Sequence, residues 1–166
     1  MKKVILSLGS ILLIASSAYH GLCSERSAAD QKFVNEAARG GMLEVELGQV
    51  AQKNGTSAEV KSFGQQMVTD HTRLNEELGD AAKKDGFEVP GGLTPKQREE
   101  IQALSKVSGK EFDSKYAQLM VKDHTEDLAA FRKAESTTQK PELKKAIADA
   151  IPVIEHHLEM AKKMQG

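Results

Sequence analysis

Apolar residues recur every three to four positions over most of the chain, as they do on the buried face of an α-helix. No stretch alternates apolar and polar residues with the period of two that a half-buried strand shows. The pattern predicts an all-α protein with four long helices in a four-helix bundle, and a short extra helix in the connection between the second and third long helices. The predicted helices run from Asp30 to about Asn54, from about Ser57 to Asp85, from Pro95 to about Lys106, from Gly109 to about Ser136, and from Pro141 to near Gln165.

Three of the predicted helix starts carry the capping-box pattern, in which Ser or Thr is followed three residues later by Glu or Gln. The pattern predicts Thr56, Thr94 and Ser108 as the N-cap residues.

A ten-residue segment occurs twice, once in the second long helix and once in the third. The first copy starts at Phe63 and reads FGQQMVTDHT, and the second starts at Tyr116 and reads YAQLMVKDHT. Within each copy the aromatic residue, the methionine and the histidine are spaced i, i+4 and i+8, close to one stripe of a helix. The repeat therefore points His71 and His124 along the apolar seams of two helices.

The other two long helices each add one polar residue to an apolar stripe. His157 lies on the stripe of the last helix, and Glu44 interrupts the small and apolar stripe of the first. A rise of about 1.5 Å per residue places each histidine roughly 21 to 24 Å into its helix, with Glu44 within about one turn of the same level. We expect these side chains to meet inside the bundle.

Such a buried polar layer needs a partner, because an unpaired buried polar group costs about 1 to 3 kcal/mol. One transition metal ion would supply it, with Glu44, His71, His124 and His157 as the predicted ligands. Three imidazoles and a carboxylate suit zinc or iron best, and manganese is also compatible. Copper is an alternative, because Met67 and Met120 would offer soft thioether ligands nearby.

Other residues of the repeat are expected to support the ligands. Asp70 and Asp123 point about 100° away from the adjacent histidines, so each is predicted to hold an imidazole on a neighbouring helix. Tyr116, Met67 and Met120 are expected beside the ligands.

Two alternatives to a metal-binding protein remain open at this point. In the first, the protein is a structural or interaction module whose buried histidines are only hydrogen-bonded. In the second, it is an iron-dependent redox enzyme, which would require an open coordination position. No Ser/His/Asp grouping, phosphate-binding loop or dinucleotide fingerprint is apparent, so the sequence does not support a hydrolase or a nucleotide-binding protein. Whether the protein is an enzyme is left open, with a non-catalytic role favoured.

The beginning of the chain has the features of an export signal. Lys2 and Lys3 precede an apolar run from Val4 to Ala18, which is shorter than the roughly 20 residues that span a bilayer. We expect residues 1–18 to be a signal peptide, residues 19–29 a flexible leader and residues 30–166 the bundle, without an integral membrane segment in the mature chain. The expected location is the periplasm. Cys23 is the one cysteine, so no internal disulfide can form.

The charge balance gives no sign of a nucleic-acid partner. The chain holds 23 Lys and Arg against 24 Asp and Glu, a formal net charge of −1. A protein that binds phosphate backbones usually carries a basic excess. The expected partner is therefore the metal ion alone, and the pattern does not predict an oligomeric state.

Four segments resemble the motifs of a known family, the exported ferritin-like proteins with domain of unknown function 4142. The resemblance covers residues of about 30 to 165. Its motifs are Phe33–Gly48, Met67–His71, Phe112–His124 and Ile151–Ala161.

The resemblance implies a ferritin-like bundle in an exported or outer-membrane-associated protein without an established activity. It also implies functional positions at Glu44, His71, His124 and His157. The chain departs from di-iron ferritins, which use Glu-x-x-His on two helices. Here the position three before each histidine holds an apolar residue instead of Glu, namely Val68, Val121 and Ile154. A single-metal or non-catalytic site is therefore expected in place of a di-iron oxidase centre.

Overall fold

The computed structural model describes residues 13–165, and their side chains from residue 28 onward. In this range it has helices and no strand, which confirms the all-α prediction. The helices are α1 (Leu13–Asn54), α2 (Ala58–Lys84), α3 (Pro95–Ser105), α4 (Gly109–Thr137) and α5 (Pro141–Met164).

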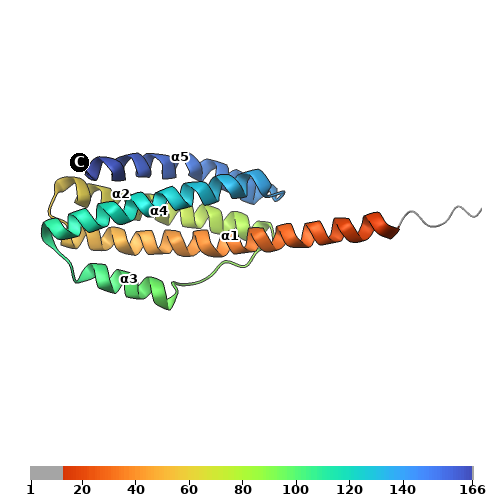
Figure 1. The fold of residues 1–166 in the computed structure, drawn as a ribbon, viewed down its shortest axis with the longest axis horizontal. Helices are drawn as coiled ribbons and strands as arrows, with labels where there is room; N and C mark the ends of the chain where they lie inside the picture. Colours follow the sequence, from red (N-terminus) through yellow and green to blue (C-terminus); the bar gives the residue numbers. More distant parts are fainter. Residues whose placement is uncertain (1–12, 166) are drawn as a thin grey trace, which may run out of the picture.

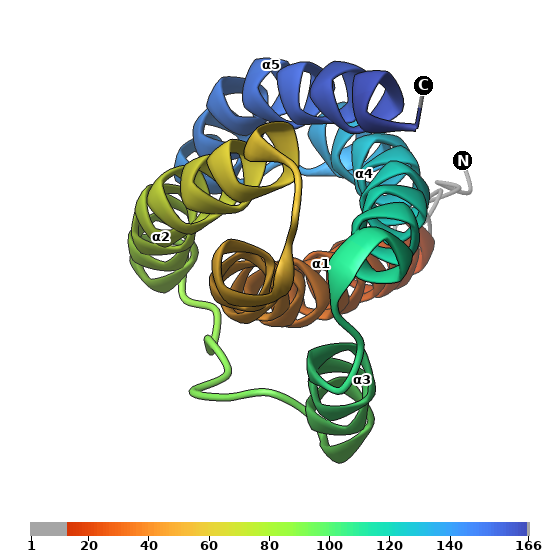
Figure 2. The ribbon, with the colours of Figure 1, turned by 90° about the vertical axis from the view of Figure 1, so that its left-hand side faces the viewer.

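The four long helices surround one core in the order α1, α2, α5, α4, as the end-on view shows (Figure 2). Helices α2 and α4 start at the same end of the bundle and run in the same direction (Figure 1). They can do so because the long connection that carries α3 returns the chain to that end. Helix α3 lies outside the bundle against α1 and α4, so it does not contribute to the layer of buried polar residues.

Helix α1 begins earlier than the pattern predicted. It starts at Leu13 instead of Asp30, so the segment 19–29, expected to be a flexible leader, is helical in the structure. No proline occurs between Leu13 and Asn54, and extending an existing helix adds one hydrogen bond per residue even where no apolar stripe is buried. This first part of α1 projects beyond the other helices (Figure 1). The predicted signal peptide falls partly on residues 1–12, outside the described residues, and stays a prediction.

The three predicted capping boxes have different outcomes. The box at Thr94 is confirmed, because its side chain accepts from the backbone N–H of Gln97 and Gln97 reaches back to the Thr94 N–H. The predicted N-cap of α2 was wrong by one residue: Ser57 is the cap, and it accepts from Val60 N. Ser108 makes no side-chain cap bond, so the third box is absent.

Two aspartates fix the relative positions of the helix ends. The carboxylate of Asp113, on α4, accepts hydrogen bonds of 2.9 Å from the backbone N–H groups of Thr56 and Ser57 at the start of α2. Asp85, at the end of α2, accepts a 2.8 Å bond from Leu143 N in the first turn of α5. Both carboxylates bind free N–H groups at helix N-termini, where negative charge is favourable. These contacts set the register of α2 against α4 and α5.

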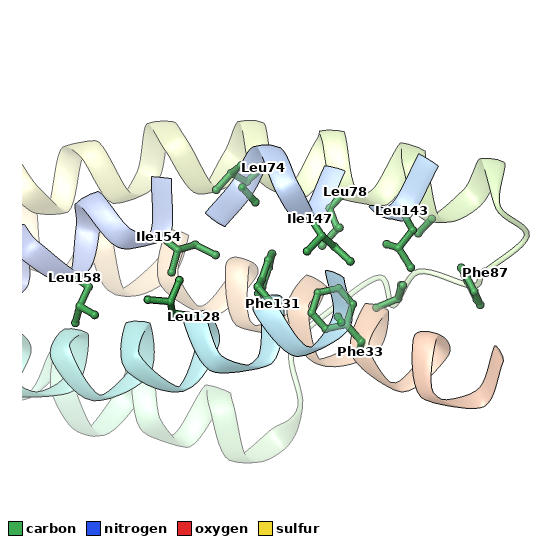
Figure 3. Close-up of a cluster of buried hydrophobic side chains, with 14 residues drawn as sticks. Phe33, Leu74, Leu78, Phe87, Leu128, Phe131, Leu143, Ile147, Ile154 and Leu158 are labelled. Atoms are coloured by element: carbon green, nitrogen blue, oxygen red, sulfur yellow. The ribbon is translucent and has the colours of Figure 1, made fainter. Parts of the chain in front are cut away.

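Two apolar clusters fill the bundle on either side of its mid-level. Figure 3 shows the first, which runs from Leu158 and Leu128 at one end to Leu143 and Phe87 at the other. The second lies toward the start of α2 and α4 and includes Phe63, Met67, Phe112, Tyr116, Met120, Leu43, Leu47, Ala51, Val60, Leu104 and Ala161.

Glycines allow α1 and α2 to approach closely. A Cβ added at Gly64 would lie 2.7 Å from the backbone oxygen of Gly48, and one added at Gly48 would lie 2.7 Å from the oxygen of Gly64. Both oxygens belong to the backbone and cannot move aside, so the two helices would have to separate to make room for an added Cβ atom.

We predict that Gly64→Ala lowers the free energy of unfolding by about 1 to 3 kcal/mol, because it overpacks this contact. Gly40→Ala is the matched control, since it also adds one methyl group within a helix but meets nothing within 4 Å. It should raise the free energy of unfolding by up to about 1 kcal/mol. Urea denaturation of both variants measures the difference, and equal effects would contradict the close packing.

Candidate metal centre

Four polar side chains, one from each long helix, meet between the two apolar clusters. Glu44 on α1 and His71 on α2 are 3% and 5% exposed, and His124 on α4 and His157 on α5 are completely buried. Each of the three histidines offers a ring nitrogen within 4.8 Å of the other two. Their ring centroids are 5.2 to 5.7 Å apart. The structure therefore brings together all four residues that depth counting selected.

One nitrogen of each imidazole is held by a neighbouring oxygen. His71 Nδ1 lies 2.9 Å from Glu44 Oε2, and His157 Nε2 lies 2.9 Å from Asp70 Oδ2. His124 Nδ1 donates to the backbone oxygen of Met120, at 3.0 Å. These contacts fix the orientation of each ring and determine which nitrogen remains free.

The other nitrogen of each ring has no hydrogen-bond partner among the described residues. These atoms are His71 Nε2, His124 Nε2 and His157 Nδ1, and all three are buried. Most buried polar side-chain atoms in proteins are paired, so three unpaired nitrogens in one layer need an explanation. Each has a lone pair when the outer nitrogen carries the proton, which is the form that binds a metal.

Burial keeps the three rings neutral. It lowers the pKa of His71 and of His157 to about 4, although Asp70 acts in the opposite direction on both. Burial also lowers the pKa of His124. At neutral pH the layer therefore presents three uncharged imidazoles, which need not lose a proton to bind a cation.

Glu44 lies on the outer side of two of the rings. Its Oε2 contacts His71 Nδ1. Its Oε1 lies 3.4 Å from His124 Nδ1, but that nitrogen donates its hydrogen bond to the backbone oxygen of Met120. Glu44 Oε1 consequently has no hydrogen-bond partner in the described part of the chain. Burial raises the pKa of Glu44 to about 7, with His124 opposing the shift and Asp123 adding to it.

The two aspartates of the repeat differ in their contacts. Asp70 binds His157 across the α2–α5 interface. Burial acts to raise the pKa of Asp70, but the hydrogen bond from His157 holds it below the usual value. Asp123 does not reach a histidine: its carboxylate contacts Lys122 Nζ at 3.3 Å, and burial raises its pKa. The two aspartates differ because their neighbouring helices present different residues. Helix α5 places His157 beside Asp70, whereas α1 places Glu44 near Asp123.

The remaining residues expected near the ligands are buried in the second apolar cluster. Met67 and Met120 are completely buried, and Met120 contributes its backbone oxygen to His124. Tyr116 stacks on Phe112 and meets the edge of Phe63, and its hydroxyl has no partner within residues 28–165. Burial, together with the charge of Glu44, raises the pKa of Tyr116 far above its usual value.

Sequence reasoning missed Asp127, which lies one turn beyond His124 on the same face of α4. Asp127 is half-buried and lines a cavity of about 20 Å³ together with Glu44 and His71. Burial raises its pKa to about 8, and the nearby charge of Glu44 adds to the shift. The spacing His-x-x-Asp is the signal that would have identified it, because residues i and i+3 share a helix face.

The chain matches a known protein family. A family described as Domain of unknown function (DUF4142) matches residues 20–164, and the chain belongs to it. No curated protein and no solved structure gives a significant match. Within residues 13–165, no helix is long and apolar enough to cross a membrane.

The pKa shifts make a prediction for the metal-free protein. An unfolded histidine has a pKa near 6.5, so the unfolded chain takes up protons that folded His71 and His157 refuse. These two residues should therefore reduce stability progressively as the pH falls from about 6.5 to about 4. In ¹H–¹⁵N spectra of the imidazoles, we expect both rings to stay neutral at about pH 5.5, with the proton on Nδ1 of His71 and on Nε2 of His157. Titration of either ring with a midpoint near 6.5 would contradict this result.

Proposed function

We propose that the protein binds one divalent transition metal ion inside the bundle, with His71, His124 and His157 as its ligands. Two observations on the same three residues carry the proposal: each offers a ring nitrogen within 4.8 Å of the other two, and each has a buried nitrogen without a hydrogen-bond partner among the described residues. Metal coordination gives all three a partner at once, and bundle interiors commonly hold such sites.

Glu44 acts in this proposal as a support and not as the fourth ligand. Its two oxygens lie 2.9 Å from His71 Nδ1 and 3.4 Å from His124 Nδ1, while the free atom of each of these rings is Nε2. The two nitrogens of an imidazole point in different directions. A carboxylate beside Nδ1 of both rings therefore lies away from the Nε2 atom of each ring, and Glu44 is not among the residues whose ligand atoms lie within 4.8 Å of one another.

The charges around the site favour a divalent ion. Three neutral imidazoles add no charge, and a bare double positive charge in an apolar core would be costly. The carboxylates of Glu44 and Asp70 stand directly behind His71 and His157, at 2.9 Å from each ring. Once ionised, these two carboxylates balance a charge of +2. The arrangement corresponds to the carboxylate–histidine–metal triads that raise ligand basicity.

Zinc or iron remains the favoured ion. Imidazole ligands suit zinc, iron and copper, whereas manganese prefers oxygen ligands, which the three-histidine set does not offer. The thioethers of Met67 and Met120 are completely buried one turn before His71 and His124, so copper stays an alternative.

The structural alternative is less well supported by the geometry. If the histidines served only to satisfy one another, their inner nitrogens would be hydrogen-bonded, yet these are the atoms without partners. A redox enzyme would need an open coordination position, and three protein ligands would leave one on the ion. We nevertheless favour metal handling or stress tolerance, because Phe63 and the two apolar clusters surround the layer closely.

The fold supports a ferritin-like domain. Two antiparallel helix pairs joined by one long crossover are the arrangement of ferritin-like bundles, and the crossover here carries α3. We propose that the domain works in the periplasm after export, as the positively charged and apolar start of the chain predicts.

The first prediction from this proposal concerns metal content. Protein produced with zinc, iron, manganese and copper available should hold about one ion per chain, and a chelator should lower its melting temperature. The His71→Ala/His124→Ala/His157→Ala variant should hold none and should melt at the same temperature with and without the chelator. His156→Ala is the control, because His156 is adjacent in sequence but exposed. Elemental analysis and calorimetry measure both effects. An unsubstituted protein without bound metal would refute the proposal.

The second prediction uses the two aspartates of the repeat. Asp70→Asn should weaken metal affinity by about 10- to 100-fold, the usual effect of removing a carboxylate behind a ligand histidine. Asp123→Asn removes the equivalent carboxylate, which contacts no histidine, and should change the affinity much less. Competition titration against a chromophoric chelator gives both constants. Equal losses in the two variants would mean that overall charge, and not the Asp70–His157 contact, supports the site.

A further inference from the structure

A small cavity connects the buried layer with the outer part of the bundle. It has a volume of about 20 Å³ and touches all four long helices, α1, α2, α4 and α5. Glu44 and His71 form its inner end, and the half-buried Asn75 and Asp127 also line it. Small residues on α1, Ala37 and Gly41, leave the space open. The cavity therefore reaches a proposed metal ligand from a less buried region.

Most of the lining of this cavity is apolar, and its polar residues are Glu44, His71, Asn75 and Asp127, three of which carry side-chain oxygen atoms. Asp127 and Asn75 offer a carboxylate and an amide at half-buried positions, and Glu44 offers its carboxylate at 3% exposure. Glu44 Oε1 is buried without a hydrogen-bond partner in the described residues, although Oε2 is held against His71. The unpaired oxygen of a cavity-lining carboxylate is a ready acceptor for a cation or its water.

The position of Asn75 depends on the glycine that faces it. A Cβ added at Gly41 would lie 2.0 Å from Asn75 Oδ1, so this side chain occupies the space that a larger residue on α1 would fill. A methyl group at position 41 would push the amide out of this position. The width of the cavity therefore depends on the absence of a Cβ atom at position 41.

The ligand histidines themselves are closed to solvent. His124 and His157 are completely buried, and His71 is 5% exposed, so an ion cannot reach their free nitrogens directly. It has to lose most of its water first, and the loss is costly unless other oxygen atoms replace that water. Carboxylate and amide oxygens can do this for a divalent cation.

Resting on the proposed function, we propose that Asp127, Asn75 and Glu44 form a transit site for a divalent cation on its way to the three histidines. Asp127 binds the ion at the half-buried position, giving up its proton as the ion arrives, and Glu44 then binds the ion through Oε1, the oxygen that is not held by His71. The cavity has room for about one water-sized particle, which suits a single, largely dehydrated ion. The site would hold the ion weakly, because its oxygen ligands are few, and the imidazoles would hold it tightly.

A transit site has a kinetic signature that a ligand does not have. A residue along the route changes the rates of association and dissociation together, whereas a ligand residue changes the equilibrium constant. Stopped-flow mixing of the metal-free protein with Co²⁺ measures association, and transfer of bound Co²⁺ to a chelator measures dissociation. Asp127→Asn removes the outer carboxylate and Gly41→Ala displaces Asn75. The matched controls are Asp123→Asn, one turn away on α4, and Gly40→Ala, which meets nothing within 4 Å.

We expect Asp127→Asn and Gly41→Ala to slow association and dissociation by about tenfold each, while the Kd stays within about threefold. The two controls should behave like the unsubstituted protein. Unaltered rates in both test variants would overturn the transit site, as would a weaker Kd with unchanged association, which would make Asp127 part of the resident site. If the unsubstituted protein binds no Co²⁺ at the histidines, the proposed function itself fails. Stoichiometric binding with unaltered rates removes the transit site alone.

Discussion

Four polar side chains on four different helices can meet only if the helices are held in a defined register. Asp85 provides the clearest restraint, because its carboxylate at the end of α2 binds Leu143 N at the start of α5. The same number of residues, 14, separates His71 from Asp85 and His157 from Leu143. Since the two helices are antiparallel, equal counts from this contact bring both histidines to one level.

Asp113 fixes the start of α2 to α4 in the same way. A shift of one turn, about 5.4 Å, would separate the rings beyond the reach of one ion.

The layer of four polar side chains divides the core into two apolar clusters, and both clusters pack against it. Phe63 meets the rings of His124 and His157 from one side, at 6.4 and 6.1 Å, and Leu74 and Ile154 belong to the cluster on the other side. Apolar walls exclude the water that would otherwise hydrate the free nitrogens. They also lower the pKa values that keep the imidazoles available at neutral pH. The apolar packing makes it costly to leave the imidazole nitrogens unpaired. The same packing keeps these nitrogens neutral and dry, and therefore available to a cation.

Helix periodicity was sufficient to predict most of this architecture, since the limits of α2, α3, α4 and α5 follow from apolar spacing and from Pro and Gly positions. The proximity of Glu44 to the three histidines was predictable too, because depth along a helix depends only on residue count. Periodicity could not show that Glu44 turns toward the outer nitrogens, which depends on its rotamer. It also could not distinguish Asp70 from Asp123, because their contacts depend on which residue the neighbouring helix presents. The start of α1 was missed because a helix can continue where it buries no apolar stripe.

The parallel course of α2 and α4 gives the duplicated segment a geometric meaning. A half-turn about the bundle axis exchanges α2 with α4 and α1 with α5, so the two copies of the repeat occupy equivalent places (Figure 2). Under this pseudo-twofold rotation, Glu44 corresponds to His157, and the Asp70–His157 pair corresponds to Asp123 beside Glu44. One residue therefore breaks the symmetry of the layer: a carboxylate stands where a fourth imidazole would complete it. The break gives the layer a polarity, with nitrogen donors on three sides and oxygen on the fourth, and this oxygen-bearing residue, Glu44, lines the same cavity as Asp127.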